Sequence, residues 1–115
     1  MNGKGSIFVD TNMFIYLLEG NNYAAEALLN KDIHFSFITK IELLGNPHVD
    51  EKAESVIKEL LSFHKKHGYT DEIESKAILL RKKYKIKIPD AIIASSALLN
   101  QIPLFTSDSE FKKIK

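Results

Sequence analysis

Four acidic side chains lie beside apolar stretches of the chain, where a charged group is unfavourable unless it has a structural or functional role. Asp10 directly follows a short apolar run, and Asp108 closely follows another. Asp90 opens the most apolar stretch of the chain, and Glu42 lies between apolar neighbours. Carboxylates act as general acids or bases, or as hard oxygen ligands for a divalent cation. These four acids are therefore the candidate functional residues.

Each acid also has an ordinary structural explanation. Asp10 could cap a helix that starts near Thr11, and Asp90 and Asp108 could be favourable anions in a first helical turn. Glu42 could simply point outward from an amphipathic helix. These explanations become less satisfactory if the four acids lie close together in the fold. Two carboxylates at about 4 Å repel each other by ~4 kcal/mol at an effective dielectric constant near 20. Such a cluster needs a shared proton or a cation.

The chemistry of the set narrows the choice of cation. An all-oxygen site without Cys or a positioned His suits Mg²⁺ or Mn²⁺. Such ions activate water and clamp the oxygens of an in-line phosphoryl displacement.

Alternating strands and helices would have to bring these acids together. Residues 7–9, 33–38 and 103–106 have the apolar or alternating pattern of strands, and a very short strand at Tyr69 is one option. Capping residues, apolar periodicity and breakers predict the helices between them: 13–18, 23–30, 39–44, a long helix from its cap Asp50 to Gly68, one opened by Thr70, one from Pro89 to Leu99, and a short last one capped by Ser107.

This alternation predicts an α/β fold around a mostly parallel sheet, with residues 1–115 as a single domain. Ligands of such sheets bind outside the carboxyl ends of the strands. Asp10 and Asp108 are therefore expected on the same rim, with Glu42 in a helix that starts just beyond another strand end.

The composition excludes several classes of protein. The chain has 115 residues, 44% of them hydrophobic, a net charge of +1 and no Cys, so it is neither disordered nor built on disulfides, thiolate zinc or an iron–sulfur cluster. Neither a leader-type segment nor a membrane span is recognised, and the absence of Cys fits the cytoplasm. The charge is uneven, with a net −4 over residues 1–57 and +5 over residues 58–87.

Four segments of the chain resemble the signature segments of PIN-domain ribonucleases, and the small size is similar to VapC-type toxins of toxin–antitoxin systems. The resemblance covers about residues 7–112. Its segments are Phe8-Val9-Asp10-Thr11-Asn12, Ile38-Thr39-Lys40-Ile41-Glu42-Leu43, Pro89-Asp90-Ala91-Ile92-Ile93-Ala94 and Phe105-Thr106-Ser107-Asp108-Ser109-Glu110-Phe111.

The resemblance implies a Mg²⁺- or Mn²⁺-dependent endoribonuclease on a three-layer α/β/α sandwich. Asp10 and Asp90 would be the main metal ligands, and Glu42 would complete the first site directly or through water. Asp108 would complete the acidic cluster and help to hold a second metal or the attacking water. Side chains that position the substrate would be Thr11, Asn12 and Thr106.

The resemblance also implies partners: an RNA substrate, a small antitoxin protein and a second copy of the chain in a homodimer. Tyr16, Phe14 and Leu17-Leu18 could form a groove for either protein partner, although packing against the sheet explains most of them better. Since no second domain is present, RNA selectivity must come from this domain or from a dimer.

Two further groups of residues have competing explanations. The basic run at residues 80–87 could place Lys85 or Lys87 on the RNA backbone, but cations that complement a helix C-terminus explain it more simply. The histidines show no ligand spacing, and a surface helix end accounts best for His64 and His67.

Three alternatives to the nuclease differ in what they require. A catalytically inactive PIN-like module would bind RNA or a protein, which the presence of all four acids argues against. A phospho-acceptor receiver domain needs an acid pair after the first strand, where residues 7–10 have a single acid. A nucleotide-hydrolysing switch needs a Gly-Lys phosphate loop, which the sequence lacks.

Overall fold

Four short strands form one parallel sheet. The computed structural model describes residues 5–106, 111 and 114, and within them the strands are β1 (Ser6–Val9), β2 (Asp32–Ser36), β3 (Lys65–His67) and β4 (Leu104–Phe105). Their order is β3-β2-β1-β4, and every pairing is parallel. The carboxyl ends of all four strands therefore lie along the same edge, where the sequence places its candidate site.

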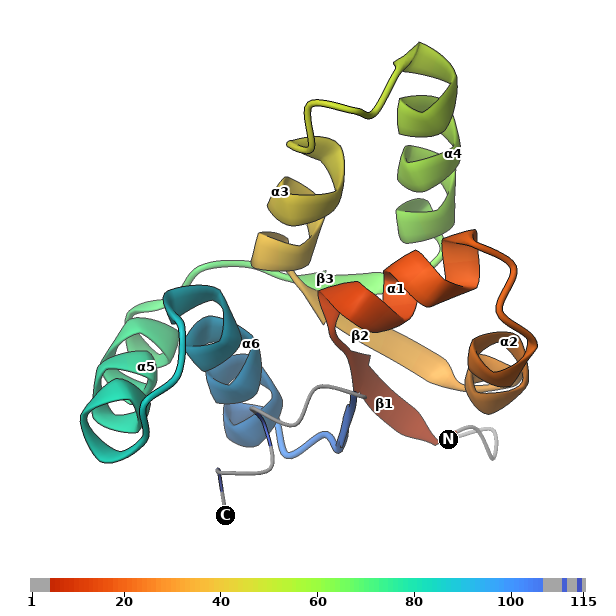
Figure 1. Ribbon diagram of the computed structural model, residues 1–115. Coiled ribbons are helices and arrows are strands. Elements are labelled where there is room, and N and C mark those ends of the chain that lie inside the picture. Colours follow the sequence, from red (N-terminus) through yellow and green to blue (C-terminus); the bar gives the residue numbers. More distant parts are fainter. Residues whose placement is uncertain (1–4, 107–110, 112–113, 115) are drawn as a thin grey trace.

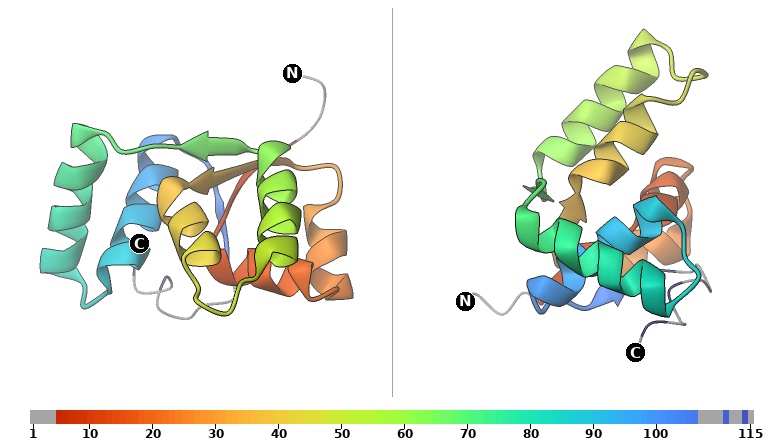
Figure 2. Two further views of the ribbon diagram at one scale, coloured as in Figure 1. Left: turned by 90° about the horizontal axis from the view of Figure 1, so that it is seen from above. Right: turned by 90° about the vertical axis from the view of Figure 1, so that its left-hand side faces the viewer.

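Six helices surround this sheet. They are α1 (Thr11–Leu18), α2 (Asn22–Leu28), α3 (Phe37–Leu44), α4 (Glu51–Ser62), α5 (Asp71–Lys83) and α6 (Ile88–Leu99). Figure 1 shows α5 and α6 on one side of the sheet and α1 and α2 on the other, while α3 and α4 rise together away from it. Figure 2 (left) shows the sheet between α6 and α4. The predicted three-layer α/β/α arrangement with a parallel sheet is thus confirmed.

The two faces of the sheet carry separate hydrophobic clusters. Successive side chains of a strand point to opposite faces, so Val9 packs with α1, α2 and α4 while Phe8 packs with α5 and α6. On the Val9 side, Phe14 and Phe35 meet edge to face with ring centroids 5.6 Å apart. Such a pair contributes about 1 kcal/mol beyond its buried area. Both faces of β1 are thereby covered, and Asp10 directly follows this strand at the rim of the sheet.

Polar side chains set most of the helix starts. Asp10, Asn21, Ser36, Asp50 and Thr70 each accept a hydrogen bond from a backbone N–H in the first turn of the helix that follows. Helix α6 differs, because its N-cap Lys87 makes no side-chain cap and a proline stands in its first turn. Proline suits this position, since its missing N–H would have had no partner there.

Several predicted boundaries were wrong; the helix predicted over residues 23–30, for example, ends at Leu28. The strand predicted over residues 33–38 ends at Ser36, and the next helix begins at Phe37 rather than at Thr39. The cause is the Ser36 hydroxyl, which accepts the N–H of Ile38 at 3.1 Å and turns the chain into a helix two residues early.

The long helix predicted from Asp50 to Gly68 was also wrong in its end. It stops at Ser62, whose hydroxyl donates to the Glu59 carbonyl at 2.6 Å, and residues 65–67 form β3. The very short strand therefore lies before Tyr69, not at it. The predicted last helix, capped by Ser107, falls largely outside the described residues. None of the described helices has the length and apolar character needed to cross a membrane.

Candidate active site

Asp10 stands at the carboxyl end of the central strand and caps α1. Its side chain is 2% exposed. One carboxylate oxygen, Oδ1, accepts the Met13 N–H at 2.9 Å, and the other, Oδ2, accepts the Thr106 hydroxyl. The capping explanation and the site explanation therefore both describe this residue. Thr106 follows β4, so the bond also joins the ends of two neighbouring strands.

Glu42 reaches the same rim from α3. Thr11, the first residue of α1, donates its hydroxyl proton to Glu42 Oε1 at 2.5 Å. The same hydroxyl lies 3.0 Å from the hydroxyl of Thr39, which is fully buried. Glu42 itself is exposed, so it does not belong to the core of α3. Its carboxylate is held by the helix that starts at Asp10.

A hollow of about 310 Å³ brings three of the four predicted acids together. Asp10, Glu42 and Asp90 line it from the end of β1, from α3 and from the first turn of α6. The described residues lining it supply three carboxylates and one ammonium group, that of Lys87, and they include no His. The remaining lining residues are Thr11, Asn12, Ile15, Pro89 and Ile93.

The placement of the other predicted site residues is mixed. Thr11 and Asn12 line the hollow, whereas Thr106 contacts the site through its bond to Asp10. Asp108 lies outside the described residues. Within residues 5–106, 111 and 114, no group of three or more His, Cys, Asp or Glu side chains is arranged so that it could hold a metal ion.

The donor chemistry of the hollow nevertheless fits Mg²⁺ or Mn²⁺. Mg²⁺ keeps several of its waters in proteins and is commonly held by one or two carboxylates together with substrate phosphates. Three carboxylates from separate elements offer hard oxygen ligands of this kind, the chain has no Cys, and no Met is among the described residues that line the hollow. The described carboxylates therefore suit a hydrated cation better than a closed protein cage.

The sequence analysis did not predict two features of the site. The sequence analysis placed Thr39 in the segment before Glu42 but assigned it no role, although it lies three residues before Glu42 and so shares its face of the helix. In the basic run both Lys85 and Lys87 are exposed, but only Lys87 is among the residues that line the hollow. Pro89 is typical of a first helical turn, so the sequence could have predicted that Lys87 and Asp90 both lie at the start of α6.

Two of the histidines, His34 and His67, form a pair away from the acidic hollow. His67 belongs to β3, and its Nε2 lies 2.8 Å from Nδ1 of the buried His34, whose Nε2 bonds Asp32 at 3.0 Å. Burial lowers the pKa of His67, and the nearby charges of His34 and Lys65 lower it further. Burial also lowers the pKa of His64, against the opposing effect of Asp32. The predicted helix-end explanation is therefore wrong for His67, whereas His64 directly follows the C-cap of α4 and its N–H donates to the Leu61 carbonyl at 3.1 Å.

The residues singled out on α1 pack mainly inward. Phe14 is completely buried, and Leu17 and Leu18 pack against the same cluster, while Tyr16 is 38% exposed. Packing against the sheet is therefore the correct explanation for all of them except Tyr16.

A family model described as "PIN domain" matches residues 7–115. The chain belongs to the PIN-domain family. A search of curated proteins found no match. The four segments that carried the resemblance in the sequence all lie within the matched residues.

Several solved structures to which this PIN domain is similar are of toxin–antitoxin complexes. A chain of the "Toxin-antitoxin complex from Klebsiella pneumoniae" is 30% identical, with a TM-score of 0.85 over 94% of this chain and 92% of that one. Chains of VapBC2 from Rickettsia felis, bound to a promoter DNA fragment, and of VapBC-1 from nontypeable Haemophilus influenzae are 22% and 24% identical. Both cover 95% of this chain and 92% of their own, with TM-scores of 0.81 and 0.80, which shows the shared fold. The resemblance to VapC-like PIN toxins is confirmed.

Proposed function

We propose that this PIN domain is a divalent-metal-dependent endoribonuclease and the toxin component of a toxin–antitoxin pair. The observation that carries the proposal is the hollow into which Asp10, Glu42 and Asp90 bring three carboxylates from separate elements. Residues 1–115 would act as one unit. A chain without Cys is compatible with the reducing cytoplasm, where RNA would be met.

Asp10 and Asp90 would be the main ligands of Mg²⁺ or Mn²⁺, and Glu42 would complete the site directly or through a water molecule. Asp108, whose position is not described, would add the fourth acid. The ion supplies an activated water and a positive charge for the phosphate oxygens of the RNA. Asp10 enters this chemistry already fixed, because backbone and hydroxyl donors hold both of its oxygens.

The other lining residues would position the RNA backbone. Lys87 brings an ammonium group to a hollow that is otherwise negative, so it can pair with a phosphate as the chain of RNA enters. Thr11 and Asn12 follow Asp10 on the first turn of α1, and Thr106 fixes the strand beside it. In this proposal none of these side chains transfers a proton.

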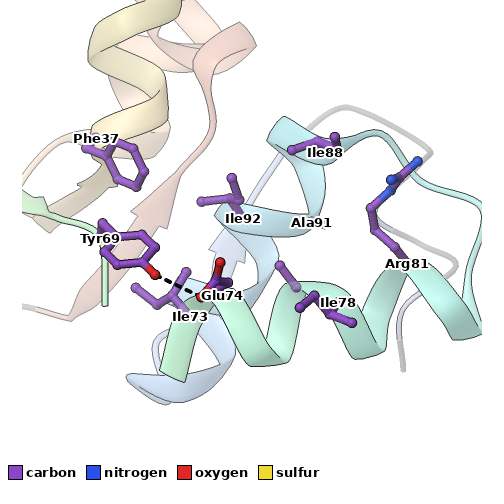
Figure 3. Close-up of a pocket in the computed structure, with 10 residues that line it drawn as sticks. Phe37, Tyr69, Ile73, Glu74, Ile78, Arg81, Ile88, Ala91 and Ile92 are labelled. Carbon is purple, nitrogen blue, oxygen red and sulfur yellow. Dashed lines mark hydrogen bonds between the residues drawn. The ribbon is translucent and has the colours of Figure 1, made fainter. Parts of the chain in front are cut away.

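Two observations support the proposed protein partners: a similar solved structure supports the antitoxin, and a second hollow supports the homodimer. The chain of 30% identity comes from a toxin–antitoxin complex, which supports a small antitoxin protein as partner here. For the homodimer, an apolar hollow of about 310 Å³ lies between α3, α5 and α6, lined among others by Phe37, Tyr69 and Ile92 (Figure 3).

This second hollow is self-complementary in charge. Glu74 and Arg81 lie seven residues apart on α5, and both line it. Two antiparallel copies of α5 that cross near Ile78 would set Glu74 of each against Arg81 of the other. Ile78 is 52% exposed, so it is available at the centre of such a contact.

The nuclease proposal is tested with two matched variants. Asp10→Asn and Asp50→Asn each alter a helix N-cap that accepts a first-turn N–H, at 2.9 Å and 2.8 Å respectively, but Asp10 alone lines the acidic hollow. With purified protein, Mn²⁺ and a single-stranded RNA, Asp10→Asn should lower the cleavage rate about 100-fold or more. Asp50→Asn should leave it unchanged, and both variants should still cap their helices, because Asn caps as well as Asp. Equal cleavage by Asp10→Asn and wild type would refute the proposal.

One observation favours the alternative, an inactive PIN-like module that binds RNA or a protein. The described residues contain no preformed group of three His, Cys, Asp or Glu side chains for a metal. Calorimetry with millimolar Mn²⁺ separates the two functions. Binding that Asp10→Asn removes supports the nuclease, whereas no binding by the wild-type protein supports the module.

A further inference from the structure

A line of hydroxyl groups connects the interior of the protein to the acidic hollow. Thr39 is 0% exposed, and its hydroxyl lies 3.0 Å from that of Thr11, which in turn lies 2.5 Å from Glu42 Oε1. The line crosses from α3 to α1 and back to α3, so it joins two helices whose starts follow neighbouring strands.

The proton count fixes the direction of these bonds. An ionised carboxylate can only accept, so the single hydroxyl proton of Thr11 is used on Glu42. The contact between the two threonines then requires Thr39 to be the donor. Both protons point outward, toward the carboxylate, and each bond polarises the next.

The two ends of this line, Thr39 and Glu42, differ sharply in their freedom to move. Thr39 is enclosed by the core and branched at Cβ, so its rotamer is fixed. Glu42 is exposed and has a long, flexible side chain. A threonine inside a helix commonly bonds a carbonyl of its own preceding turn, but Thr39 contacts a hydroxyl of another helix. The buried end of the line can therefore order its exposed end.

We propose that Thr39 is a positioning residue, which sets the Thr11 hydroxyl and through it holds the Glu42 carboxylate at the hollow. Thr39 does not line the hollow and would touch neither metal nor RNA. The part of this inference that concerns the metal rests on the proposed function, whereas the ordering of Thr11 does not.

The test compares Thr39→Val, which removes the hydroxyl at nearly constant shape, with Thr39→Ser, which keeps it. In the metal-free protein, three-bond NMR couplings about the Thr11 side chain report its rotamer. Wild type and Thr39→Ser should show one rotamer, and Thr39→Val should show averaging over several. Titration with MnCl₂ should give a dissociation constant roughly tenfold higher for Thr39→Val, as for other groups that orient metal ligands, and near wild type for Thr39→Ser.

Two controls separate positioning from a general loss of structure. Ser95→Ala removes another fully buried hydroxyl, one that bonds a carbonyl of its own helix at 2.6 Å, and should leave Mn²⁺ affinity unchanged. In a Thr11→Val background, Thr39→Val should have no additional effect on Mn²⁺ affinity, because the line is already broken.

The failures of the two proposals are distinguishable. A single Thr11 rotamer in Thr39→Val overturns the positioning role, as does a Thr39→Ser variant that loses as much Mn²⁺ affinity as Thr39→Val. Unchanged Mn²⁺ affinity in Thr39→Val also overturns it, provided that the wild type binds the ion. A wild-type protein that binds no Mn²⁺ counts against the proposed nuclease, and the couplings then decide the ordering of Thr11 alone.

Discussion

Asp10 combines two tasks in one side chain. It caps α1 and lines the acidic hollow, so the bond that starts the helix also fixes the orientation of the proposed metal ligand. The sequence could not choose between these tasks, because both call for an acid directly after a strand. In the folded chain they support one another, since the carboxylate is held by the fold before any ligand arrives.

Lys87 gives a prediction at the same scale. Replacement of Lys87 by Met removes the positive charge that lines the hollow, so RNA should bind more weakly. Because one phosphate contact is lost, the slope of log binding constant against log salt should fall by about 0.7, the value for a single strand. Asp10→Asn protein can be used for the titration, so that RNA is not cleaved.

Lys85→Met is the matched control for this measurement. It removes an exposed cation of the same run that does not line the hollow, and it should change neither affinity nor slope. Equal losses for the two variants would show that Lys87 acts only through the general charge of the run, and not through its place at the hollow.

At the scale of elements, prediction succeeded where a pattern repeats and failed where a single side chain decides. Helix α4 was predicted from its amphipathic spacing, and β1 and α6 from continuous apolar runs, which the sequence displays directly. The residues Phe37 and Ile38 continue a strand-like apolar run, yet the Ser36 hydroxyl ends the strand before them. Pattern alone cannot foresee that bond.

Strand β3 was missed for a different reason. Its sequence, Lys65-Lys66-His67, has none of the apolar alternation of a strand, because β3 is an edge and is stabilised by pairing with β2. Basic residues are common on edge strands, where they discourage pairing with other chains. The His34–His67 contact that accompanies this pairing depends on the register of two strands, which the sequence does not display.

The histidine pair predicts a pH dependence of stability. Asp32 can only accept from His34 Nε2, so neutral His34 must accept at Nδ1 from His67. The pKa of His67 and that of His64 are lowered in the folded protein. Their neutral forms therefore stabilise the fold fully above the unfolded pKa near 6.5, and this stability is lost as the pH falls through the folded pKa values.

Urea unfolding at about pH 7.5 and about pH 5 measures this effect, since this window covers the titration of His rather than that of most carboxylates. The midpoint should be lower at the acidic pH. His67→Gln, which keeps a hydrogen-bonding side chain but does not titrate, should reduce the difference. A midpoint that is unchanged or higher at pH 5 would contradict the assigned direction.

At the scale of the whole molecule, the parallel sheet and its layers were predictable, but the strand order and the second hollow were not. Alternating strands and helices specify the fold class. The order β3-β2-β1-β4 depends on which helices pack on which face, and the sequence displays this only weakly. The second hollow joins α3 to α5 and α6, which follow it much later in the chain.

That second hollow predicts self-association. Ile78→Glu would place a charge at the centre of the proposed α5 contact, where burial is costly, and should convert a dimer into a monomer in sedimentation analysis. Leu98→Glu is a control for an exposed apolar helix residue, 43% exposed, that does not line this hollow. A dimer that tolerates Ile78→Glu would exclude this surface as its interface.

The central claim is that acids remote in sequence form one site for a doubly charged ion. A crystal structure after soaking in MnCl₂, with anomalous data, tests it directly. The account predicts an anomalous peak in the hollow, with oxygens of Asp10 and Asp90 at the direct coordination distance of about 2.1 Å. The claim would be contradicted if the hollow is accessible to solvent in the crystal but contains no manganese. A manganese ion that is coordinated only by other residues would also contradict it.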